Sequence, residues 1–93
     1  MSEVLERLWE VIQERKANPR EGSYTCALLA KGTAEIARKV GEEGVETAVA
    51  SLSEGDDRVI YEAADLVYHL LVLLASRGLT WRQVEQELEA RFR

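Results

Sequence analysis

The most apolar stretch of the chain, AADLVYHLLVLLA from Ala63 to Ala75, decides the fold. It places apolar residues on every face of a helix, and such a helix must be buried on every side. The stretch is too short for a membrane span, which needs about 20 apolar residues. Since a chain of 93 residues provides only a thin layer of helices around it, we expect a helical bundle that a second copy of the chain completes.

Outward from that stretch, the helical spacing of apolar side chains predicts an all-α bundle of about five helices with no strand. The whole chain, residues 1–93, is expected to form a single domain. The expected helices lie at 3–17, at about 24–31, at 33–53, from about 57 to 77, and from about 81 to 92. The predicted capping residues are Ser2, either Ser23 or Thr25, either Asp56 or Asp57, and Thr80 together with Gln83.

The composition narrows the class of protein. A net charge of −5 argues against a nucleic-acid groove, which needs a basic face. The single cysteine, Cys26, excludes a disulfide framework and is typical of a reduced, cytosolic protein. Charged residues interrupt the apolar positions near the N-terminus, so we expect no signal peptide and no membrane association. The chain is therefore expected in the cytoplasm.

Two pairs of acidic residues form the strongest candidate site. Glu43 and Glu46 lie three residues apart on one expected helix, and Glu62 and Asp65 have the same spacing on the next. Residues at this spacing share a helix face. Because a short turn joins the two helices, the four carboxylates should converge between them. Carboxylate oxygens suit a hard cation, and the sequence therefore predicts a Mg²⁺ site that can orient a pyrophosphate group.

Less specific explanations compete with this site. Acidic pairs such as Glu42-Glu43 are usually solvated helix surface. Asp65 is harder to explain in that way, because an unpaired carboxylate in so apolar a stretch would cost several kcal/mol. A salt bridge to Lys39 or Arg38 is the alternative to a metal there. His69, one turn beyond Asp65, is either a metal ligand, a partner of a ligand, or a core residue, and we leave it outside the predicted ligand set.

The spacing of the acidic residues also resembles a known signature. Glu-Glu-x-x-Glu at 42–46, followed after fifteen residues by Glu-x-x-Asp at 62–65, is similar to the motif of the all-α nucleoside triphosphate pyrophosphohydrolases, the MazG-like superfamily. The flanking residues resemble, within that superfamily, the phosphoribosyl-ATP pyrophosphatase family of histidine biosynthesis. The residues that carry this resemblance are Ser23-Tyr24-Thr25, Leu28, Gly32, Ile36, Lys39-Val40-Gly41-Glu42-Glu43, Glu46, Ala50, Glu62, Asp65-Leu66 and Tyr68-His69-Leu70.

The resemblance implies Mg²⁺-dependent hydrolysis of phosphoribosyl-ATP to phosphoribosyl-AMP and pyrophosphate in a helical dimer or larger assembly. It implies that the metal ligands are Glu43, Glu46, Glu62 and Asp65. Glu42 is expected to join Glu43 and Glu46 in catalysis as a base or an outer group. Some relatives carry a fused cyclohydrolase domain, for whose zinc site one cysteine and one histidine would not suffice. We therefore expect the stand-alone pyrophosphatase.

Substrate contacts are less sharply defined by the sequence. Lys39 precedes Glu43 by one helical turn and is a candidate for binding substrate phosphates. Ser23 and Thr25 offer hydroxyl groups near a helix start, where free N–H groups also bind phosphate. Simple capping is the alternative role of both hydroxyls. Tyr24 could stack on a base, although packing against the protein is its expected role.

Other functions stay open at this stage. The first is a related pyrophosphatase acting on dUTP or damaged nucleotides. The second is a non-catalytic helical dimerisation module whose acidic residues are merely solvated. The third is a di-iron bundle, which is disfavoured because such bundles use Glu-x-x-His pairs where this chain has Glu62 and Asp65.

Overall fold

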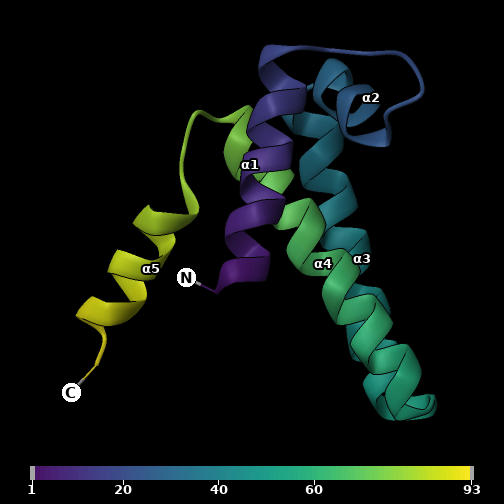
Figure 1. The fold of residues 1–93 in the computed structure, drawn as a ribbon. Coiled ribbons are helices and arrows are strands. Elements are labelled where there is room, and N and C mark those ends of the chain that lie inside the picture. Colours follow the sequence, from purple (N-terminus) through teal and green to yellow (C-terminus); the bar gives the residue numbers. More distant parts are fainter. Residues whose placement is uncertain (1, 93) are drawn as a thin grey trace.

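The computed structural model describes residues 2–92, which form five α-helices and no strand. The helices are α1 (Glu3–Ala17), α2 (Tyr24–Lys31), α3 (Thr33–Ser53), α4 (Asp56–Ser76) and α5 (Trp81–Ala90). Figure 1 shows α3 and α4 as a long antiparallel hairpin, with α1 and α2 packed at the end remote from its turn. The C-terminal helix α5 diverges from this body. The predicted all-α fold is confirmed.

The helix boundaries follow local capping chemistry. The caps predicted at Ser2, Ser23 and Thr80 are confirmed, since each hydroxyl accepts a hydrogen bond from the backbone N–H three residues further on. At Thr80, the side chain of Gln83 also accepts from the backbone N–H of Thr80, which completes a capping box. Local sequence therefore sets where these three helices begin.

Two boundary predictions were wrong. Gly55 occupies the N-cap of α4, and no side chain caps that helix. Asp56 and Asp57 lie instead in the first turn, where negative charge interacts favourably with the helix dipole. At the other end of the chain, α5 stops at Ala90, and Phe92 beyond it is exposed rather than part of the helix.

The hydrophobic core lies where α1 and α2 cover the hairpin. Its fully buried side chains are Ile12, Leu28, Ile36, Leu71, Val72 and Ala75. Trp9 and Trp81 pack against this cluster and are partly buried. Every helix except α5 supplies a fully buried member, so this end of the molecule forms a core within one chain.

The predicted burial of α4 on all sides is met only in part by the chain itself. Leu71 and Val72 are inaccessible, but other apolar residues of the same stretch are partly exposed. Towards the hairpin turn, apolar side chains are open on both helices. They are Val45, Val49, Leu52, Ile60 and Tyr61.

By length and composition alone, α4 could cross a membrane, although the apolar stretch inside it is shorter. Only a third of its most apolar 18-residue window is buried in the structure. The same helix carries Glu62 and Asp65, and it packs along α3. A core helix of a soluble protein meets the same criterion, so this feature is weak evidence for a membrane span.

Candidate functional site

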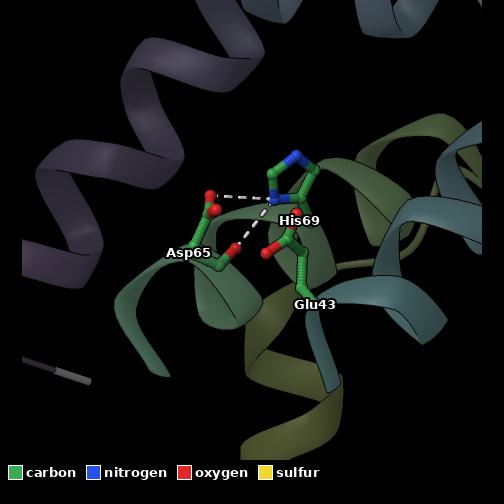
Figure 2. Close-up of side chains that lie close together, drawn as sticks. All are labelled: Glu43, Asp65 and His69. Atoms are coloured by element: carbon green, nitrogen blue, oxygen red, sulfur yellow. Dashed lines mark hydrogen bonds and ion pairs between the residues drawn. The ribbon is translucent and has the colours of Figure 1, made fainter. Parts of the chain in front are cut away.

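The four predicted carboxylates lie between α3 and α4, at the border between the core and the open end of the hairpin. Glu43 and Glu46 project from α3, while Glu62 and Asp65 project from α4. Carboxylate oxygens of Glu43 and Asp65 lie within 4.8 Å of each other and of a ring nitrogen of His69. Figure 2 shows the Glu43 side chain reaching toward the Asp65–His69 pair. Glu42, Glu43 and Glu46 form a second such group.

Burial of the two inner carboxylates is the most unusual property of the site. Glu43 is 3% exposed and Glu62 is 7% exposed. In each residue Oε2 is buried and has no hydrogen-bond partner among the described residues. A buried acceptor left unpaired costs about 1–3 kcal/mol, and more when it is charged. These two oxygens therefore require a cation or a proton.

The pKa values of these groups also show that a negative charge is unfavourable at these buried positions. Burial, followed by the neighbouring Glu46 and Asp65, raises the pKa of Glu43 to about 7. Burial and Glu46 also raise the pKa of Glu62, while Arg58 opposes that change. Like charges that are held together favour protonation unless a cation neutralises them.

Basic side chains neutralise only one oxygen of each buried carboxylate. The Nζ of Lys39 lies 3.6 Å from Oε1 of Glu43. Arg58 donates a hydrogen bond of 2.6 Å from Nη2 to Oε1 of Glu62. The Oε2 atoms of both residues are left without such a partner. Sequence reasoning missed Arg58, although its position four residues before Glu62 could have indicated the ion pair.

Asp65 does not make the salt bridge that competed with metal binding. Arg38 pairs with Glu35 and Glu42, and Lys39 pairs with Glu42 and Glu43. Within residues 2–92 Asp65 makes no ion pair with a lysine or an arginine, and its side chain contacts His69, at 3.2 Å from Oδ1 to Nδ1. His69 is 2% exposed. The four-residue offset between the two was the signal for this contact.

Glu42 lies at the edge of the cluster and has two basic partners. Arg38 donates to its Oε2 over 2.7 Å, and Lys39 donates to its Oε1 over 3.1 Å. The hydrogen bond and charge of Lys39, followed by the hydrogen bond from Arg38, lower the pKa of Glu42. A carboxylate with a lowered pKa is a weaker proton acceptor.

The three predicted substrate contacts differ in their surroundings. The hydroxyl of Ser23 accepts from the N–H of Cys26 and caps α2. The hydroxyl of Thr25 shares a hydrogen bond with that of Tyr68. Lys39 instead lines a cavity of about 230 Å³ next to the carboxylates. Lys31, Arg38, Tyr24 and Glu35 also line this cavity, so three basic side chains and one carboxylate face it, and the excess of positive charge can attract phosphate.

The cluster fits a hard divalent cation. Its donors are carboxylate oxygens, which Mg²⁺ prefers over nitrogen or sulfur ligands. Two of those oxygens are buried and unpaired. Fold and site together define a class of protein, a helical bundle with a partly buried cluster of carboxylates between two antiparallel helices.

Comparison with known proteins defines the family. Residues 5–92 match the family described as Phosphoribosyl-ATP pyrophosphohydrolase. The chain is 55% identical over 93 residues to the phosphoribosyl-ATP pyrophosphatase of Ignicoccus hospitalis, covering all of this chain and 91% of that protein. It is 57% identical over 90 residues to the protein of that name from Pyrobaculum calidifontis, covering 97% of this chain and 96% of the relative.

A longer relative matches this chain over less than half of its own length. The histidine biosynthesis bifunctional protein HisIE of Caldanaerobacter subterraneus is 46% identical over 91 residues, which are 98% of this chain and 44% of that protein. The chain belongs to the phosphoribosyl-ATP pyrophosphohydrolase family. The family and the class of hydrolase predicted from the sequence are confirmed.

Proposed function

We propose that this chain hydrolyses phosphoribosyl-ATP to phosphoribosyl-AMP and pyrophosphate in histidine biosynthesis, and that it does so with Mg²⁺ held by Glu43, Glu46, Glu62 and Asp65. Family membership supports the substrate and the reaction. The buried, unpaired Oε2 atoms of Glu43 and Glu62 support the metal site. They are the single observation that separates this cluster from solvated helix surface.

The proposed roles of the site residues differ with how deeply each side chain is buried. Glu43 and Glu62 each keep one oxygen on a base and present the other to the cation. Glu46 is exposed and faces both of them, so it can contact the cation and the solvent side together. When bound, Mg²⁺ supplies positive charge to the pyrophosphate group and makes water a better nucleophile.

Glu42 and Lys39 act at the edge of this site in the proposal. Glu42 holds Lys39 through a hydrogen bond of 3.1 Å, and we assign it this outer role rather than that of the base. Lys39 then faces the cavity and contacts the substrate phosphates. Ser23 and Thr25 already have protein partners, and their remaining lone pairs or hydrogens could still contact substrate.

The proposed assembly is a cytoplasmic homodimer of a single-domain chain. The open apolar side chains of the hairpin, with Leu52 at 87% exposure, support a partner that covers them. An isologous contact between two copies would bring together the same surface from each. Cys26 is a free thiol, as expected of a cytoplasmic protein.

The reaction can be tested by measuring pyrophosphate release. Wild-type protein with Mg²⁺ should release pyrophosphate from phosphoribosyl-ATP faster than from dUTP or other free nucleoside triphosphates. Glu43→Gln should lower kcat/KM by about 100-fold or more, since even a partner of a metal ligand is worth about 10–100-fold. Glu87→Gln, which changes an exposed carboxylate paired with Arg91, is the matched control. A preference for a free nucleoside triphosphate would instead identify the related pyrophosphatase that acts on dUTP or damaged nucleotides.

Metal binding alone tests the alternative that the chain is a dimerisation module without catalytic activity. Titration calorimetry with Mg²⁺ should show binding to the wild-type chain and its loss in Glu43→Gln and in Asp65→Asn. Equal Mg²⁺ binding by all three proteins would support the non-catalytic module and remove the proposed site.

A further inference from the structure

The imidazole of His69 has a polar partner at each ring nitrogen. Nδ1 lies 2.8 Å from the backbone oxygen of Asp65 and 3.2 Å from its Oδ1, as the dashed lines in Figure 2 show. Nε2 lies 3.0 Å from the hydroxyl of Tyr24, which comes from α2. A chain of contacts therefore runs from α2 through His69 to Asp65.

These contacts determine which nitrogen carries the hydrogen. A backbone carbonyl and a carboxylate only accept hydrogen bonds, so Nδ1 must donate to Asp65. In the neutral ring Nε2 is then bare, and it accepts from the O–H of Tyr24. Because both ring nitrogens are used in this way, His69 has no free lone pair for a metal ion.

We propose that His69 is a positioning residue whose Nδ1–H holds the Asp65 carboxylate toward Glu43, while the Tyr24 hydroxyl on Nε2 holds the ring in place. The inference rests on the proposed function to the extent that Asp65 is a metal ligand there. The side chain of Asp65 is one-third exposed and makes no ion pair with a lysine or an arginine among residues 2–92. Without the Tyr24 hydroxyl, Nε2 has no hydrogen-bond donor, and the ring is free to turn away from Asp65 and release its carboxylate.

Tyr68 offers a matched control for Tyr24. The two rings stack with centroids 6.2 Å apart, and both contact His69 edge-on. The hydroxyl of Tyr68, however, bonds to Thr25 and not to His69. Tyr24→Phe and Tyr68→Phe therefore each remove one hydroxyl from the same aromatic cluster, and only the first removes the partner of Nε2.

Nitrogen NMR shows directly which ring nitrogen of His69 carries the hydrogen. His69 is the single histidine of the chain, so an untagged ¹⁵N-labelled protein gives one unambiguous pair of ring nitrogens. In metal-free protein at pH 8 we expect a protonated Nδ1 and a bare Nε2. Tyr24→Phe should shift the resonance of Nε2, because this nitrogen loses its hydrogen-bond donor, while Tyr68→Phe should keep the wild-type pattern. A bare Nδ1 or a doubly protonated ring in the wild type would overturn the proposal.

Mg²⁺ titration then tests the consequence for Asp65. Tyr24→Phe should raise the Kd for Mg²⁺ by about 10-fold, the lower end of the effect of such outer partners, and Tyr68→Phe should leave it unchanged. His69→Asn, whose amide can replace the Nδ1–H donor, should bind Mg²⁺ more tightly than His69→Leu. Equal affinity of wild type and Tyr24→Phe, or of the two His69 variants, would overturn the proposal.

These measurements use neither substrate nor turnover, so they are independent of the reaction. If phosphoribosyl-ATP is not hydrolysed but the tautomer and the Mg²⁺ affinities follow the expectation, the proposed function fails and the role of His69 stands. If hydrolysis is observed but Tyr24→Phe changes neither the Nε2 resonance nor the Mg²⁺ affinity, the proposed function stands and the role of His69 fails.

Discussion

The two ends of the α3–α4 hairpin are built from similar residues but differ in how the chain covers them. At the end that meets α1 and α2, Ile36, Leu71 and Val72 are inaccessible to solvent. At the turn end, Leu52 is 87% exposed and Ile60 is 68% exposed. Glu43 on α3 and Asp65 on α4 lie between these two ends along the hairpin.

This difference indicates what each end contributes. The covered end supplies the folding free energy of a single chain, because burial of apolar area is the main favourable term. The open end supplies little to one chain alone, and its apolar surface favours a partner. In the proposed homodimer, the candidate site would therefore lie between the core of one chain and the apolar surface that the second copy covers.

The largest expected effect tests this contrast by truncating one leucine at each end. Leu71→Ala should lower the free energy of unfolding by about 2–5 kcal/mol, because it leaves a cavity in a packed core. Leu52→Ala should cost within about 0.5 kcal/mol in dilute protein, as exposed positions usually do. Urea denaturation of both variants measures the difference. Equal losses at low protein concentration would contradict the contrast.

The next prediction concerns self-association. Leu52→Glu places a charge on the apolar surface at the turn end and should weaken self-association by about 10-fold or more, since an unpaired charge at a buried contact costs at least about 1.4 kcal/mol. Sedimentation velocity over a range of concentrations measures this. Glu87→Gln on α5 serves as a surface control. A wild-type chain that stays monomeric at high concentration would rule out the proposed homodimer.

A smaller effect is expected from the pH dependence of stability in metal-free protein. The pKa of Glu43 is raised from 4.5 to about 7 in the folded state, so the folded chain binds this proton more tightly than the unfolded chain. The stability from this group is thus present below pH 4.5 and is lost as the pH rises through 7. Glu43→Gln has no such loss.

The experiment compares the Tm of wild type and Glu43→Gln in chelator at pH 5 and at pH 8. The variant should gain on the wild type by more than about 4–8 °C between these pH values, because that is what about 1 kcal/mol produces in a domain of this size and the raised pKa of Glu43 corresponds to about 2–3 kcal/mol. Saturating Mg²⁺ at pH 8 should reverse the order by stabilising the wild type alone. A Tm difference that is independent of pH would show that Glu43 is not buried with its proton.

The helices could be predicted from the sequence because their signals are local. The hydroxyls of Ser2, Ser23 and Thr80 mark helix starts through bonds to N–H groups three residues away. The same local reasoning failed at Asp56, because Gly55 supplies the extended backbone of the N-cap and Asp56 already lies within the first turn of the helix. The side-chain chemistry determines which residues are able to cap a helix, and the backbone conformation determines which of them occupies the N-cap position.

The sequence could predict only those features of the site that follow from the spacing of residues along a helix. The spacing of Glu43, Glu46, Glu62 and Asp65 places pairs on one face, and the structure brings Glu43 close to Asp65. The contact of Tyr24 with His69 joins residues that are 45 positions apart. No periodicity encodes such a contact, because it depends on how α2 packs on α4. Which buried oxygens stay unpaired likewise depends on packing.

The smallest predicted effect examines the border between the two ends. Gly41 lies in α3, and a Cβ added there would meet nothing within 4 Å in the chain. Gly41→Ala should therefore stabilise the chain by about 0.5–1 kcal/mol, because alanine loses less conformational entropy in a helix than glycine does. Thermal unfolding in dilute protein measures this gain. If the same variant associates more weakly than the wild type in sedimentation, the glycine serves close approach of a second copy, and the open surface extends from the turn to the site. Unchanged association would confine the contact to the turn end.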